Sequence, residues 1–268
     1  MSVWSYAQST ILNPHSRACF WKHPGQATRM VMGVLGNALL NVSEKVRPSY
    51  RQSCPVCRWE GRRFRTYVSP DIVIPSSICP VCGSFERHRH LVLGMRDVLS
   101  ERSRVPRSLL GLSLSQSIRY LLAHEGLGRC FRSDFDNRDP RYEPDIIVDL
   151  AQASFRDEAF DWVVCSHVLE HIADLDRAVD ELFRVLRPGG LAWIQVAYQE
   201  AEPRSRRIPL EPHEIDAHAW RFGQDFTGRL EREGWDVTCV HAADLELDVR
   251  QHHGLHPVER YWLVSKHS

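Results

Sequence analysis

Two matched cysteine pairs impose the strongest constraint on how this chain can fold. They are Cys54-Pro-Val-Cys57 and Cys79-Pro-Val-Cys82, separated by the 21 residues from Arg58 to Ile78. Two-residue spacing lets both thiolates of a pair face one ion, and the separation is close to that of four-cysteine zinc sites. Gly83, directly after the second pair, suits a tight turn. The sequence therefore predicts a structural zinc ion held by Cys54, Cys57, Cys79 and Cys82, with no coordination position open for catalysis.

Disulfide bonds and a redox-active pair are the alternative interpretations of these cysteines. Disulfides belong to oxidising compartments, whereas no segment resembles a signal peptide or reaches the roughly 18 apolar residues of a membrane span. A redox pair requires one motif in a βαβ setting rather than two matched copies. We therefore expect reduced cysteines and a cytoplasmic protein. The most apolar stretch, Met30–Leu40, is broken by Gly33 and Gly36. We expect a helix packed on the rest of the chain, and the alternative is a helix that lies on a membrane surface or docks on a partner.

The net charge of zero conceals a split along the chain. Residues 1–107 hold 16 Lys or Arg and 6 Asp or Glu, which gives that part a net charge of +10. The rest of the chain therefore has a net charge of −10. Eleven of the cations are arginines between Arg51 and Arg107. A basic, cysteine-bearing part followed by an acidic part indicates a domain boundary.

From Leu109 onward, short β-like runs alternate with helical runs, which is typical of βαβ units and a parallel sheet. The helical stretch Asp174–Leu186 repeats apolar residues at helical spacing and ends in Arg-Pro-Gly-Gly, a stop signal with a left-handed turn. The predicted strands are Ser108–Leu112, Cys130–Ser133, Ile146–Asp149, Trp162–Cys165, Leu191–Ala197, Trp235–His241 and Tyr261–Ser265. We expect an α/β fold with a seven-stranded doubly wound sheet. The predicted domains are an N-terminal extension (1–49), a zinc ribbon with a linker helix (50–107) and the α/β domain (108–268).

Two motifs of the α/β part resemble a known enzyme family. The segment Phe160-Asp-Trp-Val-Val-Cys-Ser-His-Val-Leu-Glu-His171, followed by Leu186-Arg-Pro-Gly-Gly190, is similar to class I S-adenosylmethionine-dependent methyltransferases of the type 11 group. The second cysteine pair followed by Gly83-Ser-Phe-Glu-Arg-His-Arg-His90 looks like a bacterial subgroup with a zinc ribbon before the catalytic domain. The resemblance covers roughly residues 50 to 268. It implies a Rossmann-like sheet that binds S-adenosylmethionine.

The chain departs from the family where the cofactor's glycine-rich loop is expected. The usual pattern is a strand that ends in an acid, then Gly-x-Gly-x-Gly opening a helix. Here Gly111 replaces the acid, and Ser113, Ser115 and Ser117 replace the glycines. Serine caps helices well, but at a position with positive φ it costs on the order of 1 kcal/mol. The resemblance assigns Gly111, Ser113 and Ser115 to the cofactor loop.

Later positions supply further cofactor candidates. Asp134 follows the second strand, 21 residues after Ser113, near the offset at which an acid meets ribose hydroxyls. By resemblance Asp149 would receive the adenine amino group and the backbone amide of Leu150 would meet the ring. Cys165 leaves the fourth strand at the crevice where such sheets bind ligands. Both acids could instead be capping residues of their loops.

Two histidines are candidate general bases. His167 follows Cys165 at the crevice, and a histidine can exchange a proton near neutral pH. The long polar segment 198–219 stands where the family builds a substrate lid, and His218 with Gly223 and Asp225 resembles a His…Gly-x-Asp pattern of the subgroup. The competing interpretation is that His167 simply lines the pocket. We expect Glu170 and His171, on the next helix, to be packing and capping residues. A solvated loop is predicted for the histidines at 252, 253 and 256.

Three functions are compatible with these patterns. The first is a methyltransferase for a hydroxyl or amine of a small molecule or glycan. The second is an RNA or protein methyltransferase that docks through the basic zinc ribbon. The third is a binding or scaffold protein in which the serine loop has lost the cofactor. The acceptor cannot be read from the motifs, because methyl transfer depends mainly on orientation.

Overall fold

The computed structural model describes most of the chain. The described residues are Thr28, Met32, Leu35, 51–68, 73–101, 105–134, 144–209 and 218–267. They form two compact units. The first runs up to Leu93 and also contains Ala242–Glu259, and the second contains Gly94–His241 and Arg260–Ser268. The predicted extension 1–49, apart from three isolated residues, lies outside the described part.

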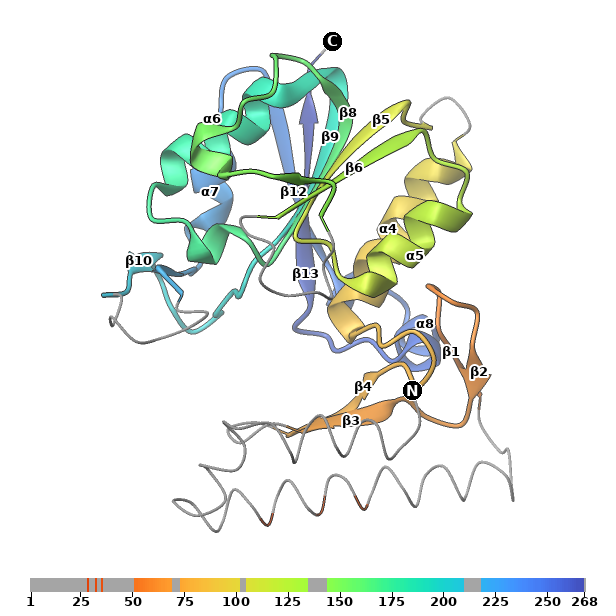
Figure 1. Ribbon diagram of the computed structural model, residues 1–268. Helices are drawn as coiled ribbons and strands as arrows, with labels where there is room; N and C mark the ends of the chain where they lie inside the picture. Colours follow the sequence, from red (N-terminus) through yellow and green to blue (C-terminus); the bar gives the residue numbers. More distant parts are fainter. Residues whose placement is uncertain are drawn as a thin grey trace. The chain divides into compact units, whose positions relative to one another are not determined.

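A seven-stranded sheet forms the centre of the second unit (Figure 1). The spatial order is β12-β13-β9-β8-β5-β6-β7. All neighbouring strands are parallel except for β13, which is antiparallel to β12 and to β9. The strands are β5 (Ser108–Leu112), β6 (Arg129–Asp134), β7 (Ile146–Ile147), β8 (Phe160–Ser166), β9 (Leu186–Gln195), β12 (Trp235–His241) and β13 (Arg260–Lys266). This arrangement confirms the predicted seven-stranded α/β fold.

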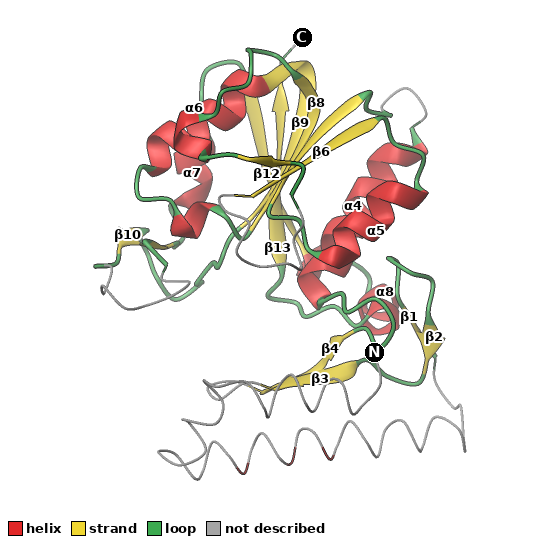
Figure 2. Ribbon diagram, viewed as in Figure 1, coloured by secondary structure: helices red, strands yellow, loops and turns green. Residues whose placement is uncertain are grey.

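Helices cover both faces of the sheet, as a doubly wound fold requires (Figures 1 and 2). Helices α6 (Leu175–Val185) and α7 (Phe226–Leu230) lie on one face, and α5 (Gln116–His124) lies on the other. The side chain of Asp174 caps α6 by accepting the backbone N–H of Arg177. The apolar residues of α6 are buried against the central strands, so the periodicity in the sequence marks the core-facing side.

The first and last residues of the strands agree with the prediction for some strands and differ for others. β5 and β12 have the predicted bounds. β9 begins at Leu186, five residues before the predicted start, because the Arg187-Pro-Gly-Gly segment continues alongside β8 with an irregular register. Gly189 has the left-handed φ of 74° that the turn signal predicts. The α6 helix therefore passes into the strand without an intervening loop.

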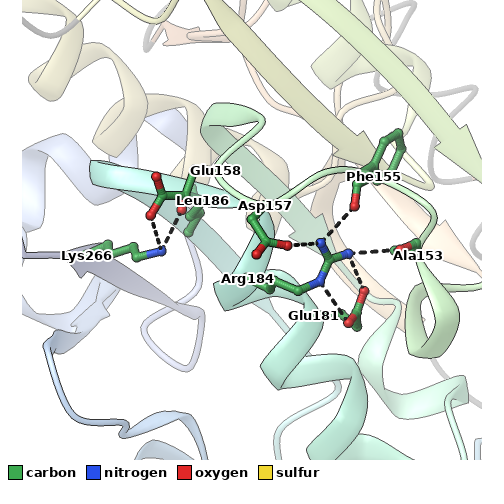
Figure 3. A network of polar contacts seen from close by, with 8 residues as sticks. All are labelled: Ala153, Phe155, Asp157, Glu158, Glu181, Arg184, Leu186 and Lys266. Carbon is green, nitrogen blue, oxygen red and sulfur yellow. Dashed lines mark hydrogen bonds and ion pairs between the residues drawn. The ribbon is translucent and has the colours of Figure 1, made fainter.

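Arg184 fastens the loop before β8 to helix α6 (Figure 3). Its guanidinium donates to the carbonyl oxygens of Ala153 and Phe155 at 2.9 and 2.8 Å. It also pairs with Glu181 at 2.7 Å and with Asp157 at 2.5 Å. These two carboxylates raise the pKa of Arg184. One side chain thus satisfies two backbone carbonyl oxygens and holds the segment that leads into β8.

The first unit consists of short strands and the turns that carry the cysteine pairs. The strands β1 (Gln52–Ser53) and β2 (Glu60–Gly61) pair antiparallel, as do β3 (Arg65–Val68) and β4 (Val73–Ile78). Helix α4 (Glu86–Ser100) begins in this unit, and the unit boundary falls inside it. The later segment contributes helix α8 (Leu247–His253), which ends at Gly254 with φ of 58°.

Helix α8 corrects the predicted solvated loop around the late histidines. His252 and His253 belong to the helix, and Nδ1 of His253 is 2.9 Å from the carbonyl oxygen of Ser53. The side chain of Gln52 donates to the carbonyl oxygen of Gln251 at 2.9 Å. Hydrogen bonds to β1 therefore stabilise a short helix that the sequence pattern alone does not reveal.

Among the described residues, no helix is both long enough and apolar enough to cross a bilayer.

Candidate functional site

The four cysteines of the two pairs come together in the first unit. The Cys54 and Cys82 sulfur atoms are 3.7 Å apart, and those of Cys57 and Cys79 are 3.6 Å apart. All four sulfur atoms lie within 4.8 Å of one another. A tetrahedral zinc ion with Zn–S bonds of about 2.3 Å places its sulfur ligands about 3.8 Å apart. The spacing of the donors therefore fits zinc.

Each cysteine pair is shaped by the same turn. The N–H of Arg58 donates to the Cys54 carbonyl at 2.9 Å, and the N–H of Gly83 donates to the Cys79 carbonyl at 3.0 Å. Both residues have left-handed backbones, with φ of 59° and 70°. Gly83 confirms the predicted tight turn. Arg58 adopts the same left-handed conformation although it carries a side chain, which makes that conformation less favourable than it is for glycine.

The short distances between the sulfur atoms change the pKa values of the cysteines. Hydrogen bonds from Cys79 and Cys82 lower the pKa of the Cys54 thiol, whereas the hydrogen bond with Cys54 raises the pKa of Cys79. Buried sulfur atoms this close together cannot all be negatively charged unless a positive charge lies between them. A divalent metal ion would remove that conflict.

Arg89 is a buried cation beside the cysteines. Its side chain is 0% exposed, and no carboxylate of the described residues lies within ion-pair distance of it. Burial lowers the pKa of the guanidinium, while the charge of Cys54, followed by that of Glu86, favours its protonated form. The guanidinium donates at 2.7 to 2.8 Å to the carbonyl oxygens of Ser77, Ser84, His253 and Gly254. Arg89 thus joins the second cysteine turn to the α8 segment.

The second cluster of candidates lies in the other unit, at the carboxyl ends of its parallel strands. Ser113 follows β5, Asp134 ends β6 and His167 follows β8. β5 is the strand from which the chain winds first to β6 and β7 and later to β8 on the opposite side. Such a switch in strand order leaves a crevice at the carboxyl edge, where doubly wound sheets bind ligands.

Ser113 and Asp134 are joined directly. The hydroxyl of Ser113 donates to Oδ1 of Asp134 at 3.0 Å, and the N–H of Ser113 donates to the carbonyl of Ser133 at 2.8 Å. Ser113 has a φ of 46°, so the first serine of the loop occupies the left-handed conformation that glycine would adopt freely. Ser115 acts as the cap of α5 and accepts the N–H of Ile118 at 3.4 Å.

The position of the missing acid is filled by a neighbouring side chain. A Cβ added to Gly111 would lie 2.1 Å from Leu114 Cδ1. Leu114 is 3% exposed, so it packs over Gly111 where the family pattern has a carboxylate. Glycine is needed at this point of β5 because the leucine approaches the backbone closely.

The remaining cofactor candidates have structural partners. Asp149 is exposed and caps the 3₁₀ turn Leu150–Gln152 by accepting the N–H of Ala151 at 2.9 Å. The Leu150 side chain is buried at 3% exposure, and Cys165 is fully buried in β8. Burial raises the pKa of the Cys165 thiol. Contact between these residues and a cofactor would involve backbone atoms and the carboxylate of Asp149.

His167 is paired with a buried carboxylate. Its Nδ1 is 2.9 Å from Oε1 of Glu170, whose side chain is 0% exposed, while the His167 side chain is 33% exposed. Burial opposes ionisation of Glu170, but the hydrogen bond and the charge of His167, together with smaller contributions from the backbone and from His171, outweigh it, so the pKa of Glu170 is lowered. Oε1 also accepts the N–H of Ala197 at 3.1 Å. With Nδ1 donating to Glu170, Nε2 of His167 is the nitrogen that can accept a proton.

The backbone of His167 is strained in a way that fits a functional position. Its φ is 57°, and its N–H donates to the carbonyl of Gln195 at 2.8 Å. Left-handed conformations of residues other than glycine cost about 1 to 3 kcal/mol and concentrate at functional sites. The hydrogen bonds to Gln195 and Glu170 hold the imidazole at the end of β8.

His218 reaches the same region from the other side of the 3₁₀ turn Leu169–His171. Its ring lies 4.8 Å from that of His171, measured between centroids, and the N–H of Ala219 donates to the carbonyl of Glu170 at 2.7 Å. Both predicted bases therefore lie next to this turn. Within the rest of the predicted lid, residues 210–217 lie outside the described part.

The Gly-x-Asp part of the predicted pattern anchors the start of that lid segment. Asp225 accepts the backbone N–H and the hydroxyl of Ser205, each at 2.5 Å, and pairs with Arg229 at 3.3 Å. A Cβ on Gly223 would lie 2.5 Å from the carbonyl oxygen of Glu202. Residue 223 is a glycine because the neighbouring backbone leaves no room for a Cβ. Asp225 holds the loop in place through its hydrogen bonds to Ser205.

The pairing of Glu170 with His167 was missed by sequence reasoning, which treated the acid as a packing residue. The available signal is the His-x-x-Glu spacing directly after an apolar strand, since residues three apart meet across one turn.

One stretch of the chain is similar to a known protein family. Residues 124–194 match the methyltransferase domain family Methyltransf_11. This stretch runs from the end of α5 to β9 and contains Asp134, Asp149 and His167.

Two curated relatives are similar over part of their length. A Mycolicibacterium smegmatis protein described as an S-adenosylmethionine-dependent methyltransferase is 36% identical over 107 residues, which is 38% of this chain and 40% of that protein. A sterol 24-C-methyltransferase of Aspergillus fumigatus is 39% identical over 67 residues, which is 23% of this chain and 18% of that protein. The matches thus cover less than half of either relative.

Solved structures of low identity are also similar. An S-adenosylmethionine-dependent methyltransferase from Mesorhizobium loti has a TM-score of 0.42 at 14% identity, covering 63% of this chain and 96% of that chain. A chain from the complex of the Haloferax volcanii Trm112 methyltransferase activator with a methyltransferase has a TM-score of 0.44 at 19% identity, covering 65% of this chain and 91% of that chain.

Proposed function

We propose that this chain, whose residues 124–194 match a methyltransferase domain family and whose sheet has seven strands, transfers a methyl group from S-adenosylmethionine to a hydroxyl or amine of a small molecule or glycan. The observation that carries this proposal is the His167–Glu170 pair at the carboxyl end of β8. A sulfonium methyl is already electrophilic, so the protein must mainly orient the acceptor. A hydroxyl acceptor also has to lose a proton, and Nε2 of His167 would take it.

The buried carboxylate of Glu170 supports the role of His167 as the group that takes up the proton. Glu170, whose pKa is lowered, holds its carboxylate oxygen Oε1 2.9 Å from Nδ1 of His167. It therefore stabilises the charge that His167 gains when it removes the acceptor proton, as a base-orienting acid does in other enzymes. The exposed side chain of His218, next to His171, is the second candidate for contact with the acceptor.

The carboxyl edge would hold the cofactor with the residues it has. S-adenosylmethionine supplies the methyl group. Asp134 would accept the ribose hydroxyls, since one carboxylate can receive both, and Asp149 with the amide of Leu150 would meet the adenine. The loop of Gly111, Ser113 and Ser115 would lie along the amino-acid part, where no carboxylate stands at the family's position. Cys165 would support this crevice from beneath.

We further propose that the four cysteines hold a structural zinc ion. The fit of the sulfur spacing to tetrahedral zinc, and the charge balance that a divalent ion would give to four thiolates, support this assignment. A cytoplasmic location, which we also propose, would keep these cysteines reduced and able to bind the metal. We propose that residues 50–107 form the zinc ribbon with its linker helix and that residues 108–268 form the methyltransferase domain.

A non-catalytic binding protein is the second candidate, favoured by one observation. Leu114 fills the space over Gly111, and Ser113 already engages Asp134. If these contacts exclude the cofactor, the fold would serve as a binding module.

Isothermal titration with S-adenosylmethionine separates the two candidates. The methyltransferase predicts saturable binding that Asp134→Ala weakens at least about tenfold, the effect of losing hydrogen bonds to a charged group. Absence of binding at millimolar cofactor, in protein with a normal thermal transition, would exclude the enzyme.

Glu170→Gln tests the His167 pair in protein that binds the cofactor. We expect methyl transfer to an accepted hydroxyl substrate to fall about 10²-fold, the scale of general base catalysis, with unchanged cofactor affinity. Glu181→Gln, at a carboxylate paired with Arg184 away from this edge, is the matched control and should leave the rate within about twofold.

A further inference from the structure

The second unit contains a cavity at the opposite end of its strands from the candidate active site. The cavity has a volume of about 910 Å³ and is lined by the starts of β5, β6 and β8, the Arg187–Leu191 segment and the end of β13. β5 has five residues, so its two ends lie about 13 Å apart at the rise of a strand. A ligand in this cavity would therefore occupy a different site from one at Ser113 and His167.

Cationic side chains dominate the lining. Arg107, Arg129, Arg187 and Lys266 line the cavity, and Asp161 is the one carboxylate among its described lining residues. We call this cavity the basic pocket. An excess of positive charge around a concave, partly enclosed space attracts anions and concentrates their binding there.

Asp161 is fully engaged with the protein and does not cancel this charge. Its Oδ2 accepts the backbone N–H groups of Arg107 and Ser108, both at 2.8 Å, and its Oδ1 accepts Arg187 at 2.8 Å. The hydrogen bonds from Arg187 and Ser108 prevail over burial and keep the pKa of Asp161 low. Asp161 and Arg187 thus form a neutral pair that fixes the pocket wall.

Arg107 and Arg129 supply the available guanidinium groups. They are neighbours, since the N–H of Arg129 donates to the carbonyl of Arg107 at 2.8 Å. Both are exposed, and within the described part of the chain neither has a carboxylate at ion-pair distance. The Arg129 guanidinium lies 4.6 Å from the centre of the Phe131 ring, which restricts its motion.

Lys266 adds a weaker positive charge. Its ammonium donates to the Leu186 carbonyl at 2.9 Å and lies 3.6 Å from Glu158, as Figure 3 shows. This distance leaves the ion pair with Glu158 loose. The charge available to a ligand therefore comes mainly from the two arginines.

We propose that the basic pocket binds a phosphate-bearing small molecule. The planar fork of a guanidinium matches a phosphate group with two parallel hydrogen bonds, and two arginines without a carboxylate partner among the described residues line this pocket. The volume is in the range of sites for small organic ligands, roughly 300 to 1,000 Å³. Neither the methyl transfer nor the zinc site uses these residues.

Calorimetric titration of the full chain with inorganic pyrophosphate tests this proposal. We expect saturable binding, weakened about tenfold or more in the double variant Arg107→Gln/Arg129→Gln because charged hydrogen bonds are lost. Arg129→Lys should weaken binding less, since the charge stays and the fork is lost. The control is Arg156→Gln, at an exposed arginine that does not line the pocket, and it should bind like the parent.

Three results would overturn the proposal. The first is equal affinity in the parent and the double variant when the thermal transitions of both free proteins agree. The second is equal weakening by Arg156→Gln, which would indicate diffuse surface binding. The third is binding of a single-stranded RNA oligonucleotide, with a steep salt dependence, but not of pyrophosphate. If the double variant does not fold, Arg129→Lys alone decides the question.

Discussion

Arg58 in the first cysteine turn and Gly83 in the second occupy equivalent positions, each donating its N–H to the carbonyl of the first cysteine of its own pair. Their φ values, 59° and 70°, place both in the left-handed region. The chain therefore contains an internal comparison between a residue with a Cβ and one without it.

Replacing Arg58 by glycine is expected to stabilise the protein. The left-handed backbone costs a residue with a side chain on the order of 1 kcal/mol, and the Arg58→Gly variant removes that cost. The converse change, Gly83→Ala, should destabilise by a similar amount. Denaturant unfolding of the zinc-loaded protein measures both. Equal effects of the same sign in the two variants would contradict the equivalence of the turns.

Loss of the metal should unfold the first unit. Metal analysis is expected to find about one zinc ion per chain, and Cys79→Ser should lose it, because three thiolates leave the tetrahedral site incomplete. Thermal unfolding in a chelator should resemble that of the variant. Cys239→Ser, at a partly buried cysteine of β12 outside the cluster, is the control and should keep its metal. A Cys79→Ser protein that retains zinc would refute the assignment.

Arg89→Lys is expected to be poorly tolerated despite keeping the charge. Lysine has three donors on a flexible stem and cannot reach the four carbonyl oxygens that the guanidinium satisfies. The unsatisfied acceptors should cost about 2 kcal/mol or more in the free energy of unfolding. Arg51→Lys, at an exposed ion pair with Glu60, should change stability by less than about 0.5 kcal/mol.

Ser113→Gly should leave stability nearly unchanged and raise cofactor affinity. Relief of the left-handed backbone gains about 1 kcal/mol, and loss of the hydrogen bond to Asp134 costs about the same. The freed carboxylate of Asp134 could then receive the ribose. Titration of the variant with S-adenosylmethionine measures the change. Unchanged or weaker binding would show that the serine belongs to a reorganised cofactor site.

The hydrogen bonds between Asp225 and Ser205 should make the free energy of unfolding depend on pH. Although burial opposes ionisation of Asp225, the hydrogen bonds from Ser205 prevail and its pKa is lowered. Its contribution is therefore fully present above the unfolded pKa of about 3.9 and is lost as the pH falls through the lower folded value. Parent and Asp225→Asn should differ most in unfolding free energy near pH 6 and converge below about pH 4. A constant difference across this range would exclude the charge as the cause.

Periodicity and spacing predict much of the fold and of the metal centre. The α6 stripe from Leu175 to Val185 and the β5 and β12 bounds follow from patterns of neighbouring residues, which act locally. The cysteine turns are similarly local. The α8 helix could not be predicted, because its hydrogen bonds connect Gln251 and His253 to residues about 200 positions earlier.

The candidate active site shows the same limit. The positions of Ser113 and His167 after their strands follow from the motif order. Their left-handed backbones, the packing of Leu114 over Gly111 and the burial of Glu170 depend on three-dimensional packing. The basic pocket joins Arg107, Arg187 and Lys266 from distant parts of the chain, and no sequence pattern marks it.

The discontinuous first unit has a consequence for synthesis on the ribosome. Arg89 and the two cysteine pairs emerge early, but the carbonyl oxygens of His253 and Gly254 follow more than 150 residues later. At roughly 5 to 20 residues synthesised per second, the carbonyl oxygens of His253 and Gly254 are made about 8 to 30 s after Arg89. The cysteines can take up metal during that interval, so zinc binding would come before completion of the unit around it.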